Sequence, residues 1–217
     1  MKRNCSKKAF TLAEVLITLV IIGVIAAITV PTLMQNTERQ EFVTRLKKAD
    51  SVLKQISYKI AMDSGYPVGD YSFMENDDFF ESFAQNINHI QKCTEANQGC
   101  FTPDTIKALN GSNWAKYDRV NSLVAADGIT YGWHNGQYCT GKGLSSDDER
   151  NCIGRFIVDV NGQKAPNMFG RDVFFFGVIN DKGIVPAGEA NGSADCKRGS
   201  NGITCAAKVL RENKIAY

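Results

Sequence analysis

The sequence predicts an α+β protein in which a long N-terminal helix packs on a small antiparallel sheet. An uncharged apolar run near the N-terminus continues into a segment with helical periodicity, and no Gly or Pro lies between Thr32 and Ser64. Later in the chain, short apolar segments alternate with glycine-containing turns, which is typical of antiparallel strands. At 217 residues, the chain is long enough for one domain beyond this helix.

The apolar run covers Val15 to Met34 and contains 20 residues without a formal charge. A helix of about this length crosses a bilayer. Two helix breakers lie inside it: Gly23 weakens a helix by about 1 kcal/mol relative to Ala, and Pro31 lacks a backbone donor and predicts a kink. Glu14 directly precedes the run, and a carboxylate there costs roughly 2.5–3.5 kcal/mol if it reaches the membrane centre. We therefore expect a positive partner for Glu14.

The segment after the apolar run shows an amphipathic pattern. Its apolar positions are three or four residues apart and therefore lie on one stripe of a helix. They are Phe42, Leu46, Ala49, Leu53, Ile56 and Ile60. One helix is thus expected from about Phe10 to Asp63, roughly 80 Å long at about 1.5 Å per residue. The stripe is the surface on which we expect a globular head to pack.

The rest of the chain is expected to form this head. Asn76 to Asp78 cap a helix that extends through Ile90, and four or five short strands follow. The expected strands cover residues 122–126, 129–133, 155–160, 172–179 and 184–185. Their antiparallel sheet has an apolar face, and the helical stripe is the available cover for it.

The residues around the start of the apolar run resemble a known signal. Lys7 and Lys8 are followed by AFTLAE and then by the apolar helix. This arrangement resembles the class III signal of type IV pilins and type II secretion pseudopilins. The resemblance implies that a prepilin peptidase cuts between Ala9 and Phe10 and N-methylates the new terminus at Phe10. It also implies that Glu14 pairs with the Phe10 amine of a neighbouring subunit. The family usually has Gly before the cut, so Ala9 is a departure.

The same resemblance implies an organisation of the chain and a set of partners. Residues 1–9 form a leader, 10–34 a membrane-spanning half that becomes the filament core, 35–63 the amphipathic half of the helix, and 64–217 the head. The expected partners are other copies or homologous pilins, the peptidase, an inner-membrane assembly platform, and membrane lipid before assembly.

An ordinary secretory signal and a plain signal anchor are the alternatives for the N-terminus. A secretory signal has an apolar core of about 7–15 residues and ends in a small-residue cleavage site, which Ala26 and Ala27 resemble. Neither alternative requires a glutamate at the start of the apolar segment or an amphipathic continuation of the helix. The pilin-type signal accounts for both and is preferred.

The distribution of charge indicates a topology and argues against nucleic acid as a partner. The chain has 25 Lys and Arg and 23 Asp and Glu. Four of the basic residues lie in the leader, so its removal leaves 21 basic and 23 acidic side chains. Such a chain has no strongly basic overall field for nucleic acid. The leader charges predict a cytoplasmic N-terminus and an extracytoplasmic head, as in a single-pass protein of the bacterial inner membrane.

The seven cysteines divide between the leader and the head. Cys5 falls in the leader, whereas the other six form an even set in a segment expected to be extracytoplasmic, which favours disulfides over zinc. Six cysteines allow fifteen pairings, and the sequence does not select one. We expect the local pairs, each closing a loop of roughly ten residues worth about 2–3 kcal/mol. These pairs are Cys93 with Cys100, Cys139 with Cys152, and Cys196 with Cys205.

One loop of the head carries oxygen side chains that suit calcium. Asp159 and Asp172 lie at the facing ends of two expected strands, and Asn161 and Asn167 lie in the glycine-containing loop between them. Some secretion pseudopilins hold calcium in a head loop, so the resemblance brings this metal into consideration. The run lacks the D-x-D-x-D-G pattern and its terminal glutamate, however. The alternative is a turn in which Asn and Gly reverse the chain and the aspartates accept hydrogen bonds from loop amides.

The function expected from these observations is structural: a subunit of a type IV pilus or of a type II secretion pseudopilus, polymerised from the inner membrane. Enzymatic activity is not expected, because the sequence has no G-x-S-x-G, P-loop or H-E-x-x-H motif. Two alternatives stay open. One is a membrane-anchored extracytoplasmic binding module, with or without calcium, that does not polymerise. The other is a competence pseudopilin that contacts DNA through a local basic patch, such as one near Lys197 and Arg198.

Overall fold

The computed structural model describes residues 11–67, 69–71, 74, 77–94, 98–102, 104–115, 121–135, 139, 144–189 and 196–217. The chain divides into two compact units, Met1–Glu38 and Arg39–Tyr217, which we call the N-terminal unit and the head unit. Ala9 and Phe10, together with the rest of the predicted leader, lie outside the described residues.

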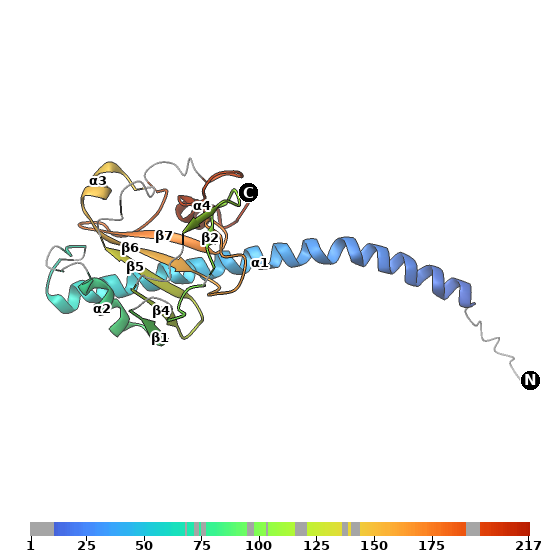
Figure 1. The fold of residues 1–217 in the computed structure, drawn as a ribbon, viewed down its shortest axis with the longest axis horizontal. Coiled ribbons are helices and arrows are strands. Elements are labelled where there is room, and N and C mark those ends of the chain that lie inside the picture. The colour runs from blue at the N-terminus through green and yellow to red at the C-terminus, as the bar shows by residue number, and fades with distance from the viewer. Residues whose placement is uncertain are drawn as a thin grey trace, which may run out of the picture. The chain divides into compact units, whose positions relative to one another are not determined.

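A single helix, α1 (Leu12–Ser64), contributes to both units. Pro31 lies inside the N-terminal part of this helix, and the helix continues through it without a break. Threonine hydroxyls in neighbouring turns bond to carbonyls of the same helix. Thr29 Oγ1 donates to the Ile25 carbonyl at 2.9 Å, and Thr32 Oγ1 donates to the Ile28 carbonyl at 3.1 Å. In Figure 1 the blue part of the helix curves gradually, without the sharp kink expected from a proline.

The head unit is built on an antiparallel sheet whose described strands follow the order β1-β4-β5-β6-β7-β8. They are β1 (His89–Cys93), β4 (Asn121–Ala125), β5 (Thr130–Asn135), β6 (Cys152–Asp159), β7 (Val173–Ile179) and β8 (Gly183–Pro186). From β4 to β8, strands that are neighbours in the sheet are also consecutive in the sequence. The turn between β4 and β5 contains Gly128, whose φ of 80° lies in the left-handed region that glycine adopts readily.

Shorter elements flank this sheet. They are the helices α2 (Asp78–Asn86), α3 (Ser146–Arg150) and α4 (Cys205–Glu212), and the paired strands β2 (Ile106–Lys107) and β3 (Asn113–Ala115). The prediction that the first of these helices extends through Ile90 is wrong. It ends at Asn86, and residues 89–93 form the edge strand β1, which pairs with β4. The apolar spacing was misleading because Ile90 is 74% exposed on that edge strand and is not part of a buried helix face.

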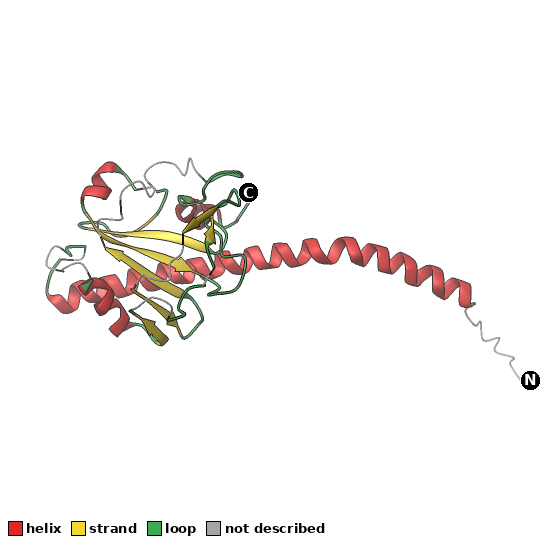
Figure 2. Ribbon diagram, viewed as in Figure 1, coloured by secondary structure: helices red, strands yellow, loops and turns green. Residues whose placement is uncertain are grey.

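The apolar stripe of α1 lies at the centre of the core in the head unit. Every predicted stripe residue is buried, with exposed fractions that range from 0% at Leu46 and Ala49 to 8% at Ile56. One face of the sheet shares a cluster with this stripe. Its members from the sheet include Leu123, Tyr131, Phe156, Val158, Phe174 and Phe176. Figure 2 shows the helix running along the yellow strands. The prediction that α1 covers the apolar face of the sheet is confirmed.

Two cations on α1 tie the helix to loops at one end of the sheet. Arg45 donates to the carbonyl oxygens of Val160 at 2.7 Å and of Asp127 at 3.1 Å. Lys48 forms an ion pair with the Asp127 carboxylate at 2.7 Å. Rotation of the helix about its axis would break these contacts, so they help to fix which face of α1 meets the sheet.

The opposite face of the sheet packs on segments from the C-terminal half of the chain. Ile157 and Phe175 of the sheet share a second cluster with Phe169, Ala187 and Ile203. Three disulfides close loops around these layers, and they join the same cysteines that local spacing pairs. They are Cys93–Cys100, Cys139–Cys152 and Cys196–Cys205.

Candidate functional site

Glu14 lies in the first turn of α1 and closes a capping box with Thr11. The backbone N–H and the hydroxyl of Thr11 donate to Glu14 Oε2 at 2.9 Å and 2.8 Å, and the Glu14 N–H donates to Thr11 Oγ1 at 3.3 Å. These reciprocal bonds satisfy donors that the start of a helix leaves without partners. The resemblance to pilins implies a role for Glu14 between subunits, and the T-x-x-E spacing additionally signals this local role.

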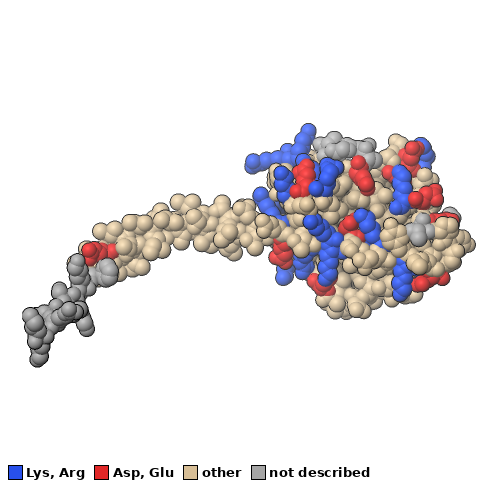
Figure 3. All heavy atoms as spheres, turned by 180° about the vertical axis from the view of Figure 1, so that it is seen from behind, with Lys and Arg blue, Asp and Glu red and all other residues tan. Residues whose placement is uncertain are grey.

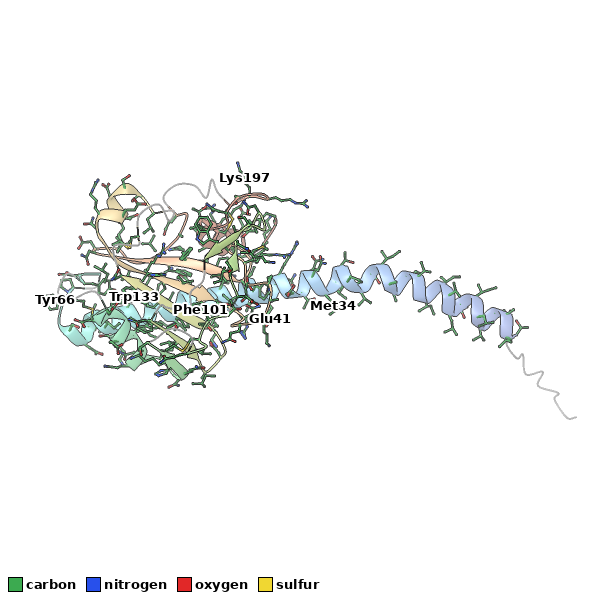
Figure 4. The ribbon with its side chains drawn as sticks, viewed as in Figure 1. Met34, Glu41, Tyr66, Phe101, Trp133 and Lys197 are labelled. Atoms are coloured by element: carbon green, nitrogen blue, oxygen red, sulfur yellow. A yellow bond between two sulfur atoms is a disulfide. The ribbon has the colours of Figure 1, made fainter. Side chains whose placement is uncertain are left out.

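The helix after Glu14 exposes a continuous apolar surface. Fourteen large apolar side chains between Leu12 and Met34 are 43–78% exposed. This stretch is almost entirely uncharged in Figure 3, and Figure 4 shows Met34 on it, projecting from the helix. Among the described residues, α1 is the one helix that is long and apolar enough to cross a membrane. Because full burial of one such side chain is worth about 1.5–3 kcal/mol, this surface requires lipid or other apolar helices around it.

Gly23 lies within this surface, and a side chain at this position would not collide with other described residues. A Cβ atom added at Gly23 would meet no described atom within 4 Å. Glycine weakens a helix by about 1 kcal/mol relative to alanine. Packing among the described residues therefore does not require glycine at this position.

Asp159 and Asp172 lie together at one end of the β6–β7 pair. Asp159 pairs with Val173 in the strand register, and the Val160 N–H donates to the Asp172 carbonyl at 2.8 Å. Both aspartates are fully buried. Burial raises the pKa of each carboxyl, to about 6 for Asp172, and the charge of Asp172 raises the pKa of Asp159 further. The N–H groups of Asn167 and Met168 each donate to Asp172 at 2.7 Å, as the turn alternative predicts.

Three oxygens at the end of β6 and in the loop that follows have no hydrogen-bond partner among the described residues, although they are shielded from solvent. They are Asp159 Oδ2, Asn161 Oδ1 and Asn167 Oδ1. A buried oxygen without a partner costs about 1–3 kcal/mol, and hard cations such as calcium take oxygen ligands of this kind. The described residues contain no cluster of three or more His, Cys, Asp or Glu side chains, so a metal here would need the amide oxygens. With those amides included, the four predicted ligands offer oxygen atoms, the ligand type that calcium takes.

Comparison with known proteins gives a match for the N-terminal signal. Residues 4–30 match the family model described as the prokaryotic N-terminal methylation motif. No curated protein and no solved structure matches the chain. The matched range includes the predicted cleavage site, both residues of the capping box, and Gly23. The chain therefore carries the prepilin-type N-terminal signal of type IV pilins and pseudopilins.

Proposed function

We propose that the mature chain is a structural subunit of a type IV pilus or of a type II secretion-type pseudopilus. Prepilin peptidase removes residues 1–9 and N-methylates Phe10. The chain then stays in the inner membrane, with its head unit on the extracytoplasmic side, until an assembly platform adds it to a filament of identical or homologous subunits. The observation that supports this proposal best is the methylation motif joined to fourteen exposed large apolar side chains. A filament core of like helices buries the surface that lipid covers before assembly.

Glu14 sets the axial register between subunits in this proposal. The two bonds from Thr11 end on Oε2, and no residue that the structure describes donates to Oε1. The second oxygen is therefore able to accept a bond from the Phe10 amine of a neighbouring subunit while the capping box stays closed. Attraction between these opposite charges is stronger in an apolar filament core than in water.

Three variants separate the register role of Glu14 from its role in the capping box. Glu14→Gln keeps an acceptor for Thr11 without the charge, Glu14→Ala removes both, and Thr11→Ala opens the box but retains the carboxylate. Filaments are sheared from cells and quantified by immunoblotting relative to the membrane-inserted chain. Both Glu14 variants should lose filaments by about tenfold or more, because a charge-assisted bond is worth about 1.5–3 kcal/mol. Thr11→Ala costs about 1 kcal/mol of helix stability and should retain most filaments.

Two outcomes would contradict the register mechanism. Wild-type filament levels in Glu14→Gln would show that the charge is not needed. Equal losses in Thr11→Ala and Glu14→Ala, at normal membrane levels, would assign the effect to the capping box instead. Mass spectrometry of the mature N-terminus tests the processing step separately. Methylated Phe10 is expected, whereas another terminus would favour the membrane-anchored binding module that does not polymerise.

We also propose that the loop between β6 and β7 binds calcium. The observation in favour is the set of three shielded oxygens without partners, on Asp159, Asn161 and Asn167. These residues and Asp172 would hold the ion, whose positive charge would offset the two buried carboxylates. Binding of this kind would stabilise the head unit, both in a filament subunit and in a module that does not polymerise.

Thermal unfolding of the full chain in an uncharged detergent tests the calcium proposal. At about 100 times its dissociation constant, a ligand that binds the folded state adds about 2.7 kcal/mol, so calcium should raise the unfolding midpoint. Asp159→Asn conserves the shape of the side chain and should remove this shift. Asp147→Asn, at an exposed position of α3, should retain it. An unchanged midpoint in the wild type would contradict the proposal and leave the turn alternative as the account of this loop.

A further inference from the structure

The head unit contains an open pocket of about 770 Å³ with a strongly basic lining. Five of its nine lining residues carry a positive side chain and none carries a negative one. The five are Arg39, Arg171, Lys197, Arg198 and Lys208. Figure 3 shows Lys and Arg side chains gathered at the end of the head unit where Figure 1 places the C-terminus. This local excess contrasts with residues 10–217 as a whole, which have 21 basic and 23 acidic side chains.

The fold places three of these cations through backbone contacts near a disulfide. The Ser200 N–H donates to the Lys197 carbonyl at 3.0 Å, which closes a turn that contains Arg198. The Cys196–Cys205 disulfide joins this turn to the start of α4. On that helix, Lys208 Nζ donates to the Cys196 carbonyl at 3.0 Å. The positions from which Lys197, Arg198 and Lys208 extend are therefore set by the fold.

The backbone conformation of Gly170 places its neighbour Arg171 at the same pocket. Gly170 has a φ of 79°, and an added Cβ would lie 2.9 Å from Cys205 Sγ, so a larger residue would displace the loop from the disulfide. The Tyr217 hydroxyl donates to the Gly170 carbonyl at 2.5 Å. Burial raises the pKa of Tyr217 and the Arg171 guanidinium opposes this rise, which agrees with their proximity.

No carboxylate of the described chain lies within ion-pair distance of these cations, although the charge of Glu212 reaches Tyr217 in the pocket lining. Within the described residues none of the five forms an ion pair, whereas Arg45, Lys48 and Lys54 of the same unit each do. In addition, Arg39 Nε is shielded from solvent and has no acceptor among the described residues. A shielded charged donor without an acceptor is costly, so the Nε–H marks a position where an oxygen of a ligand would be stabilising.

We propose that this pocket binds a small ligand that carries two or more phosphate groups. Guanidinium groups bind phosphate oxygens in a bidentate manner, and lysines add point charges. Five cations exceed what one phosphate neutralises, and the cavity falls within the range of about 300–1,000 Å³ that is typical of small-molecule sites. The phosphates belong either to a soluble compound or to the headgroup of an anionic phospholipid. The site does not depend on filament assembly and is tested on the unassembled chain.

The probe is inorganic tripolyphosphate, titrated by calorimetry into the full chain in nanodiscs of zwitterionic lipid. The variant Lys197→Gln/Arg198→Gln removes two pocket charges. Its matched control, Lys47→Gln/Lys59→Gln, removes two exposed charges of α1 outside the pocket. We expect the control to bind like the wild type. The pocket variant should bind at least about tenfold more weakly, and its affinity should fall less steeply with salt.

A third variant tests the buried donor. Arg39→Lys keeps the charge but removes the Nε–H that has no acceptor. An additional hydrogen bond to a charged group predicts about a tenfold loss of affinity in this variant. Affinity equal to that of the wild type would overturn the placement of a phosphate at Arg39.

The source of the phosphates is distinguished by repeating the titration in nanodiscs that contain cardiolipin, an anionic phospholipid with two phosphate groups. If the wild type binds tripolyphosphate more weakly in these nanodiscs than in zwitterionic ones, and the pocket variant shows no such difference, the lipid headgroup competes for the pocket. If the wild type binds tripolyphosphate equally in both kinds of nanodisc, the ligand is a soluble compound. No binding in either lipid, or equal losses in both double variants, would overturn the proposal. The proposal would also be overturned if duplex DNA bound more tightly per phosphate than tripolyphosphate at the same salt concentration, because this result would indicate a nucleic-acid surface.

Discussion

Replacement of Leu46 by alanine tests whether the amphipathic half of α1 is part of the core of the head unit. Leu46 is 0% exposed and lies in the cluster that joins the stripe to the sheet. Truncation of a leucine in such a position costs about 2.7–5.0 kcal/mol, through lost apolar transfer and the cavity that remains. For a unit of 179 residues, each kcal/mol lowers the unfolding midpoint by about 2–4 °C. A loss of about 3 kcal/mol therefore corresponds to about 6–12 °C.

The measurement is the thermal transition of the near-ultraviolet circular dichroism signal, which reports on the aromatic core, with the full chain in an uncharged detergent. Lys47→Ala is the matched control, because Lys47 is the exposed neighbour of Leu46 on the same helix and alanine and lysine have similar helix propensities. Its midpoint should change by less than about 2 °C. A loss of less than about 1 kcal/mol in Leu46→Ala, or equal shifts in both variants, would refute the assignment of α1 to this core.

Three further predictions concern other parts of the chain. A Cβ atom at Gly154 would lie 2.1 Å from the Trp133 ring, so Gly154→Ala should cost about 1–3 kcal/mol and change tryptophan fluorescence, with partial recovery on adding Trp133→Phe. Burial tends to raise the pKa of Asp148, but the hydrogen bonds from Lys182 and from the helix N-cap outweigh it and lower that pKa. The resulting stability is present above the ordinary carboxyl pKa and is lost as the pH falls below about 4, so Lys182→Met should reduce the acid dependence of urea unfolding. Gly23→Ala should raise the helix content in detergent and lower filament yield, and unchanged filaments would show that the missing Cβ is not needed for packing.

Periodic apolar patterns made the long helix and most of the sheet predictable. The stripe from Phe42 to Ile60 repeats over five turns, so a chance match to helical spacing becomes improbable. The edge strand β1 had no comparable pattern. Its first four residues are exposed, and only Cys93 is buried. An edge strand is defined by its pairing with a neighbour, here β4, which is distant in the sequence and leaves no local signal.

The candidate sites show the same limit. The Thr11–Glu14 capping box was not predicted, although its T-x-x-E spacing is a local signal for it. The basic pocket has no such signal, because it combines α1, the loop before β7 and the C-terminal segment. Lys197 and Arg198 are neighbours in the sequence, which by itself indicates a local basic patch. Their association with Arg39, more than 150 positions earlier, depends on the tertiary fold. The net charge of the chain does not indicate the pocket, because acidic residues elsewhere offset the positive charges of its lining.

The two units differ in whether their apolar surfaces are covered by other parts of the described chain. In the head unit, the buried stripe, the sheet and three disulfides satisfy one another within one chain. In the N-terminal unit, exposed apolar side chains and Gly23 have no described partner that would explain them. Substitutions in the head unit should therefore act first on folding, and those between Leu12 and Met34 should act first on insertion or assembly at unchanged stability of the head. A variant in the apolar run that unfolds the head unit would contradict this expectation, because the contacts that stabilise the head unit lie within that unit.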